Sequence, residues 1–258
     1  MKISIGICVR NEENTVIQAL NSIIESAKLL DAKYQWSLYI CLNGTTDKSG
    51  ALIKIWSEKN KHIDLQFIIL TKANLVEAQR AVFSLAEKIV VDFFSFFDAD
   101  IIVEKQCLSE MIKIIEHDQS VRVVYASSLP LYRDKKTILE KVLNQYDISP
   151  TIFSPRKHLH GRAFIAKTWN IPKTDPPLLI DDVYLSFYFL SKYGHKSIKK
   201  ADNSIVYFRQ IRTFKDFYRV FRRRQIEIEK CLNLFPTFKK LPKEQVNRQI
   251  IWSKLFRE

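Results

Sequence analysis

The sequence predicts an α/β protein with a doubly wound, mostly parallel, Rossmann-like sheet flanked by helices. Short apolar runs rich in β-branched residues alternate with amphipathic helical segments through the first half of the chain. The links between these segments are short. This alternation is typical of parallel strands joined by crossover helices. Of the 258 residues, 47% are hydrophobic, so the chain can bury a full core.

Five strands are expected in the first half. The run at 2–9, KISIGICV, is continuously apolar, as expected for a strand that is covered on both faces. Asn11 or Asn14 can cap the helix that follows it and ends near residue 30. The remaining expected elements are strands at 37–42, 63–70, 93–97 and 121–126 and helices at 51–58, 75–88 and 106–117.

The pattern changes after about residue 129, where the chain becomes mixed in character and more basic. The expected elements there are a strand at 161–166, a helix at 181–193, an extended segment at 198–208 and a basic amphipathic helix at 214–234. We expect these elements to complete the same domain. The chain then forms one domain with two halves, residues 1–128 and residues 129–258.

Basic residues dominate the charge. There are 41 Lys and Arg residues against 28 Asp and Glu, a formal net charge of +13. Such a surface attracts nucleic acid, anionic membrane or phosphorylated ligands. The four cysteines form no C-x-x-C pair, which argues against a zinc site and favours a reducing, cytoplasmic setting. No apolar run reaches the roughly 18–20 residues that span a bilayer.

Three polar clusters follow three of the expected strands. They are Arg10-Asn11-Glu12, Asn43-Gly44-Thr45 and Asp98-Ala99-Asp100. In open α/β sheets, ligands bind beyond the carboxyl ends of the parallel strands. The three clusters are therefore expected to converge on one crevice.

The Asp98-Ala99-Asp100 sequence indicates a metal site. Two carboxylates one residue apart, where a strand opens into a loop, can both face one divalent cation. Mg²⁺ or Mn²⁺ accepts oxygen ligands from few protein groups and completes its shell with phosphates and water. The alternative is a loop with two solvated aspartates.

A second carboxylate pair, Asp181-Asp182, opens the helix expected at 181–193. Either residue can cap that helix, because acidic side chains favour a helix N-terminus. The same position also suits a general base. The nearby His158-x-His160 pair lacks a third ligand close in sequence, so we expect it to belong to a substrate-lining loop rather than to a metal site.

These motifs, in this order, resemble the family 2 glycosyltransferases, which have the GT-A fold. The resemblance covers roughly residues 1–230. The segment at 5–13 is similar to the family's opening strand and its Tyr-Asn-Glu-Glu turn, and the segment at 42–47 to its Asp-Asp-Gly-Ser-Thr-Asp turn. Residues 97–100 match its D-x-D motif, and 181–185 resemble its Glu-Asp motif.

The resemblance implies an inverting transfer of a sugar from a nucleotide-sugar donor to an acceptor hydroxyl. Residues 1–128 would then bind the donor, and residues 129–258 would face the acceptor, a saccharide or a lipid-linked molecule of the cell envelope. Asp98 and Asp100 would hold Mg²⁺ or Mn²⁺ against the donor diphosphate, and Asp182 would be the base, with Asp181 beside it. The implied donor contacts are Cys8, Arg10, Glu12, Asn43, Asn74, Arg80 and Asp98.

The basic helix at 214–234 admits three interpretations. Its cations, Arg222 among them, could be solvated, could reach the donor diphosphate, or could meet an anionic membrane. In the membrane interpretation its aromatic side chains enter the lipid interface at the inner face of the membrane. In the competing interpretation they pack in the core while one arginine contacts the donor.

Three other functions are weaker. A sugar-1-phosphate nucleotidyltransferase usually carries a Gly-rich basic loop after its first strand, whereas residues 10–14 are acidic and lack Gly. A nucleic-acid-binding module would suit the net charge, but no known binding motif occurs, and no nucleic acid is expected as a partner. A transferase-like scaffold without activity is disfavoured by the intact Asp98, Asp100 and Asp182.

Overall fold

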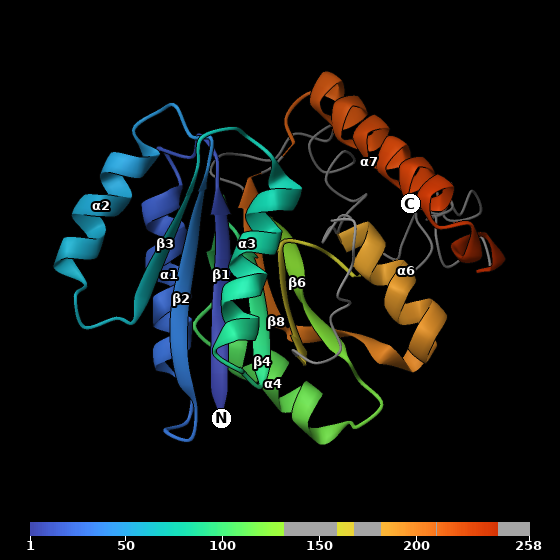
Figure 1. Cartoon of the computed structure of the whole chain (residues 1–258), viewed down its shortest axis with the longest axis horizontal. Coiled ribbons are helices and arrows are strands. Elements are labelled where there is room, and N and C mark those ends of the chain that lie inside the picture. Colours follow the sequence, from blue (N-terminus) through green and yellow to red (C-terminus); the bar gives the residue numbers. More distant parts are fainter. Residues whose placement is uncertain (132–158, 168–181, 210, 242–258) are drawn as a thin grey trace, which may run out of the picture.

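The computed structural model describes residues 1–131, 159–167, 182–209 and 211–241, and these residues form a mixed α/β fold around one eight-stranded sheet (Figure 1). The strand order is β3-β2-β1-β4-β7-β6-β8-β5. The strands are β1 (Lys2–Val9), β2 (Gln35–Asn43), β3 (Leu65–Leu70), β4 (Phe93–Asp98), β5 (Ile101–Val103), β6 (Val123–Leu131), β7 (Ala163–Lys167) and β8 (Ile198–Arg209). The α-helices are α1 (Val16–Lys28), α2 (Ser49–Lys59), α3 (Leu75–Lys88), α4 (Cys107–His117), α6 (Asp182–Tyr193) and α7 (Phe214–Leu234).

The sheet is mostly parallel, as the sequence predicts. β3, β2, β1 and β4 pair in parallel, and β6 pairs in parallel with β8. β7 is antiparallel to both of its neighbours, β4 and β6, and β5 is antiparallel to β8. One continuous sheet therefore contains strands from both halves of the chain.

Helices cover both faces of the sheet, and each face has its own apolar core. One core packs α1, α2 and α4 against the sheet, and the other packs α3 and α6. Because successive side chains of a strand point to opposite faces, Ile5 and Ile7 of β1 enter the first core while Cys8 packs against the second. Asp98 follows Phe94 and Phe96 on the α3 side of β4, by the same alternation.

Gly6 allows α3 to approach the sheet closely. A Cβ atom at this position would lie 2.5 Å from Cγ1 of Val82 on α3, closer than packed atoms tolerate. A larger residue would push α3 away from β1, and the N-terminal end of α3 lies beside the turns that carry the candidate site.

Three details differ from the sequence predictions. β5 was not expected, and β6 extends to Leu131 rather than ending at 126, because it continues past a register shift at Ala126/Ser127 along β8. The predicted cap of α1 is also wrong. The N-cap residue is Thr15, whereas Asn11 adopts a left-handed turn (φ 55°) and its Oδ1 accepts the backbone N–H of Thr46.

Helix α7 lies beside α6 and slants in the same direction in this view (Figure 1). Its boundaries match the prediction, and Oγ1 of its N-cap Thr213 accepts the N–H of Asp216. The interpretation that packs its aromatic residues in the core is wrong for Phe214 and Tyr218, which are 65% and 53% exposed. Among the helices of the described residues, none has the length and apolar character to span a membrane.

Candidate active site

The carboxyl ends of the central strands bring the first candidate residues together. In the strand pairing, Cys8 of β1 lies opposite Cys41 of β2 on one side and opposite Asp98 of β4 on the other. The Cys41 thiol and burial raise the pKa of Cys8 well above its ordinary value, so this thiol stays protonated. Cys8 therefore offers an uncharged surface directly beside Asp98.

The turns after β1 and β2 are joined by reciprocal hydrogen bonds. Besides the bond from Thr46 to Asn11, the N–H of Glu13 donates to Oδ2 of Asp47 at 3.0 Å. Oε2 of Glu13 accepts the N–H of Lys48, also at 3.0 Å. The side chains of Asn11 and Glu13 are used in these hydrogen bonds between the two turns. Arg10 and Glu12 are the other side chains of the first turn that a ligand could contact.

Arg10 and Glu12 differ in their surroundings. Arg10 is exposed, whereas Glu12 is half-buried and accepts the hydroxyl of Thr15 at 2.9 Å. Burial raises the pKa of Glu12, and the hydrogen bond from Thr15 lowers it. The charges of Asp100 and Arg209 also act on Glu12, which places this residue between the D-x-D turn and the end of β8.

Asn43 and Asn74 shape the next part of the crevice. Asn43 is buried, and its Oδ1 accepts the N–H of Asn74 at 2.7 Å. Asn74 is the N-cap of α3 and accepts the N–H of Glu77. Between them in space lies Gly44, whose φ of +58° and whose approach to Ala73 exclude a side chain. Arg80 lies half-buried on α3.

Asp98 lies in a cluster of opposite charges. Desolvation of its carboxyl and the negative charge of Asp100 raise the pKa of Asp98 to about 7, and Arg162 opposes this rise. Asp182 raises it further, and Arg223 opposes it. The backbone N–H of Asp98 donates to the carbonyl of Arg162 at 2.9 Å. The cluster joins the D-x-D turn to β7, α6 and α7.

Asp182 is the first residue of α6, and its carboxylate contacts two groups of the described residues. Oδ2 accepts the N–H of Gly161 at 3.1 Å and contacts Nη1 of Arg224 at 3.3 Å. A Cβ atom on Gly161 would lie 3.1 Å from Cβ of Asp182, so glycine permits this close approach. Asp181 and His158 lie outside the described residues. Nε2 of His160 contacts Nη1 of Arg162 at 2.7 Å.

The arginines of α7 divide between solvent and the carboxylates. Arg222, the residue singled out from the sequence, is exposed. Its neighbour Arg223 acts on Asp98 and pairs with Glu227 at 3.5 Å, and Arg224 pairs with Asp182. Sequence reasoning missed Arg162, Arg223 and Arg224 as members of the cluster. The only signal for Arg162 was its position in the His-Gly-Arg segment.

The donor set at the D-x-D turn suits a hard divalent cation. The carboxylate of Asp100 makes no hydrogen bond or ion pair within the described ranges, and the pKa of Asp98 beside it is raised by burial first and by the charge of Asp100 second. A cation between them would offset this negative charge. No group of three or more His, Cys, Asp or Glu side chains suited to a metal occurs in the part of the chain that is described.

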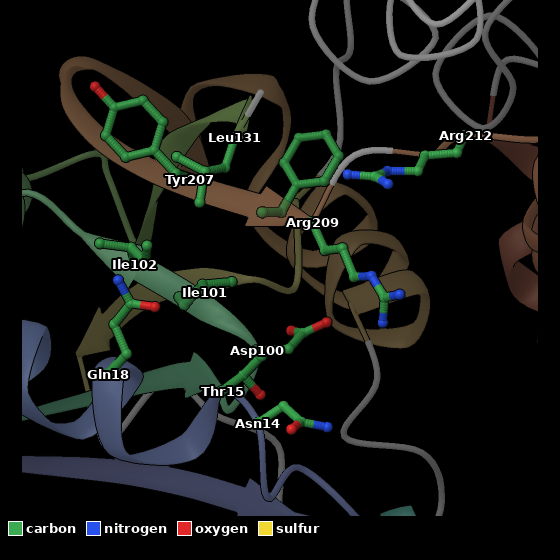
Figure 2. Close-up of a pocket in the computed structure, with 11 residues that line it drawn as sticks. Asn14, Thr15, Gln18, Asp100, Ile101, Ile102, Leu131, Tyr207, Arg209 and Arg212 are labelled. Carbon is green, nitrogen blue, oxygen red and sulfur yellow. The ribbon is translucent and has the colours of Figure 1, made fainter. Parts of the chain in front are cut away.

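A cavity of about 490 Å³ opens beside Asp100, between α1, β5 and the end of β8 (Figure 2). Its charged lining residues are Asp100, Arg209 and Arg212, and its apolar wall includes Ile101 and Phe208. The guanidinium of Arg162 stacks on the ring of Phe208 at 3.6 Å, so the cavity wall is also in contact with the carboxylate cluster.

Solved structures share this fold at low sequence identity. A fragment of TarS from S. aureus is 15% identical, with a TM-score of 0.58, and the match covers 81% of this chain and 60% of that one. The mannosyltransferase PcManGT from Pyrobaculum calidifontis is 15% identical, with a TM-score of 0.62 and coverages of 87% and 61%. Glucosyl-3-phosphoglycerate synthase from Mycobacterium tuberculosis is 16% identical, with a TM-score of 0.54 and coverages of 83% and 74%.

These matches confirm the predicted GT-A fold class, and the chain spans about three fifths of the length of the first two proteins. A search of curated proteins found no match. The family model described as "Glycosyl transferase family 2" matches residues 4–167, which contain β1 to β7 and the D-x-D turn. The chain therefore belongs to glycosyl transferase family 2.

Proposed function

We propose that the protein is an inverting, metal-dependent glycosyltransferase that moves a sugar from a nucleotide-sugar donor to an acceptor hydroxyl. The observation that carries the proposal is the cluster of Asp98, Asp100 and Asp182 at the strand ends, in a chain of this family. Residues 1–128 form the donor half and residues 129–258 the acceptor half. The acceptor is a saccharide or lipid-linked molecule of the cell envelope.

Asp98 and Asp100 hold Mg²⁺ or Mn²⁺ in this proposal. Support comes from the burial of Asp98 next to the negative charge of Asp100 and from two structures of similar fold. PcManGT was solved with GDP-Man and Mn²⁺, and the mycobacterial synthase with Mn²⁺, UDP-glucose and phosphoglyceric acid. A bound divalent cation neutralises negative charge on a diphosphate leaving group.

Asp182 is the general base. Its carboxylate lies within the electrostatic reach of Asp98, so an acceptor hydroxyl next to Asp182 would face the donor sugar. The N–H of Gly161 and the guanidinium of Arg224 both contact Oδ2, so they orient the carboxylate that takes the hydroxyl proton. Asp181 is the alternative base.

The donor nucleotide binds along the α3 side of the strand ends. Cys8, Arg10 and Glu12 border the base from the first turn, Asn43 and Asn74 from the second, and Arg80 from α3. In this arrangement the buried Asn43 and the exposed Asn74 position the backbone that meets the nucleotide. Of the roles open to Arg222, its exposed side chain favours the membrane contact over the diphosphate, and the exposed Arg223 acts on Asp98 through its charge.

The enzyme acts in the cytoplasm at the inner face of the membrane. The exposed Phe214 and Tyr218 on α7, with the cations Lys215, Arg219 and Arg222 near them, suit a peripheral contact with anionic lipid.

Hydrolysis of nucleotide sugars tests the proposal. Purified protein is incubated with a panel of UDP-, GDP-, dTDP- and CMP-sugars, with Mn²⁺ or with EDTA, and the released nucleotide is measured. We expect hydrolysis of one donor class that requires Mn²⁺ and that Asp98→Asn abolishes. Equal hydrolysis with EDTA would contradict the metal, and no hydrolysis of any donor would contradict the transfer.

A further inference from the structure

The cavity beside Asp100 lies on the opposite side of the sheet from the proposed donor site. Its wall residues Ile101 and Phe208 belong to the core on the α1 side. Cys8 and Asp98 belong to the α3 side. The two regions meet at the turn that carries Asp100 and at Phe208, whose ring contacts Arg162, so a molecule in the cavity can approach the reaction centre from the α1 side.

Positive groups gather around the cavity. The guanidinium of Arg209, at the end of β8, makes no hydrogen bond or ion pair with any other described residue. Figure 2 shows this side chain extending toward Asp100. Arg212 follows it at the rim. Asn14 and Thr15, at the N-terminal end of α1, line the cavity. The first turn of α1 contains no acidic residue that would offset the partial positive charge of this helix end.

The remaining polar lining can hydrogen-bond a small ligand. Asn14, Thr15 and Gln18 contribute amide and hydroxyl groups from the start of α1. The volume of about 490 Å³ suits a sugar-sized molecule rather than a single ion. Two arginines, neutral hydrogen-bonding groups and an aromatic wall together describe a site for a phosphorylated or carboxylated polyol.

We propose that this cavity is an acceptor subsite in which Arg209 and Arg212 bind a phosphate or carboxylate group of the acceptor. The inference rests on the proposed transferase function and deepens it by naming the acceptor class. With its anionic group held by the arginines, the acceptor extends past Asp100 toward Asp182. Asp100 disfavours an anion at its own edge, which directs the negative group to the arginine end.

Binding of inorganic phosphate tests the subsite without catalysis. Line broadening of the ³¹P resonance is measured with the wild type, with Arg209→Gln/Arg212→Gln and with Lys199→Gln. Lys199 is an exposed cation near the other end of β8, so its loss tests whether removing a positive charge away from the cavity has any effect. We expect saturable broadening in the wild type and in Lys199→Gln, and at least a tenfold weaker effect in the double variant.

Equal broadening in the double variant, or none in the wild type, overturns the subsite. Repeating the titration with Mg²⁺ and a saturating nucleoside diphosphate separates the cavity from the donor site. Undiminished phosphate binding is expected, and competition between the two ligands overturns the placement of the subsite on the α1 side.

Transfer assays decide whether the bound anion is an acceptor group or a free anion. Donor-loaded enzyme receives phosphorylated, carboxylated and neutral polyols, and the products are identified by mass spectrometry. We expect transfer to the anionic polyols, with the preference lost in the double variant. Equal use of neutral polyols by the wild type overturns the acceptor assignment. If no donor is hydrolysed at all, the transferase function fails, while the phosphate titration still decides the subsite.

Discussion

Arg224 of α7 lies 3.3 Å from Oδ2 of Asp182, and this ion pair ties the last long helix to the first residue of α6. Both side chains are largely buried, with 16% and 15% of their surfaces exposed. The carboxylate proposed as the general base is therefore held by a residue 42 positions later in the chain. The docking of α7 and the geometry of the reaction centre are coupled through this contact.

Arg224→Gln is expected to destabilise the protein and to slow it. Loss of a hydrogen bond to a charged group that is largely buried should lower the free energy of unfolding by about 1–3 kcal/mol. Turnover should fall because the Asp182 carboxylate loses its contact with Arg224 and is held less firmly. Chemical denaturation and donor hydrolysis measure the two effects. Arg219→Gln is the matched control, since Arg219 is 71% exposed, and its effect should stay within about 0.5 kcal/mol.

Asp182→Asn should lower turnover by about 10²–10⁴, the usual contribution of a positioned base, and leave donor affinity nearly unchanged. The asparagine keeps the shape of the side chain and an oxygen for the N–H of Gly161, so the fold should persist. Steady-state kinetics and calorimetry with the donor separate these effects. Turnover like that of the wild type would assign the base elsewhere, with Asp181 first to be tested.

Asp100→Asn should remove metal-dependent nucleotide binding while the fold survives, because Asp100 is exposed and its carboxylate has no partner among the described residues. Calorimetric titration of the nucleotide with Mn²⁺ and with EDTA measures the effect. Nucleotide affinity that is the same in EDTA as in Mn²⁺ for the wild type would rule out the proposed role of the metal.

Gly161→Ala should impair turnover more than donor binding. The added methyl group would meet Cβ of Asp182 at 3.1 Å and displace either the helix start or the 159–161 segment. Leu159 restricts that segment, because its N–H donates to Oγ of Ser186 at 2.9 Å. Since small displacements of a reacting group are costly, we expect a loss of roughly tenfold or more in turnover. Unchanged turnover would show that the Gly161–Asp182 contact has no part in the reaction.

The exposed aromatic and basic side chains of α7 should bind anionic vesicles at low salt. Replacing Lys215, Arg219 and Arg222 by Gln should weaken sedimentation with such vesicles by on the order of a hundredfold, at about 1 kcal/mol for each cation. Donor hydrolysis should continue. Lys54, Lys59 and Lys61, which are exposed on or just after α2, provide a control with the same loss of charge. If the wild-type protein does not sediment with anionic vesicles at low salt, the membrane contact is wrong and these cations are solvated.

The sequence predicts the parallel part of the fold well, because local signals coincide there. Apolar runs such as Phe93–Asp98 are long, end in polar turns and alternate with amphipathic helices, so periodicity alone locates them. β5 was not predicted because a strand of three residues is too short to show a hydrophobic periodicity. The cap of α1 was predicted wrongly because the side chain of Asn11 accepts a hydrogen bond from Thr46 in the turn after β2. No local sequence pattern indicates this contact.

The same distinction applies to the candidate site. Asp98 and Asp100 were found because one strand end carries both. The pairing of Arg224 with Asp182 and the effect of Arg223 on Asp98 depend on the packing of α7 beside α6, which is a tertiary contact. Likewise, the sequence gives no reason to group Arg209 with Asn14, because only the folded chain brings β8 to the start of α1.

The position of β7 between β4 and β6 has a consequence for synthesis of the chain. Each of these two strands is made before the strand that separates them, so a nascent chain must leave a gap in the sheet until residue 167 has emerged. Until then the phenylalanine-rich β4 has an unpaired edge, the kind of surface on which chains aggregate. The protein should therefore depend on chaperones most strongly while the ribosome is between β6 and β7, and fragments that stop before residue 163 should be insoluble.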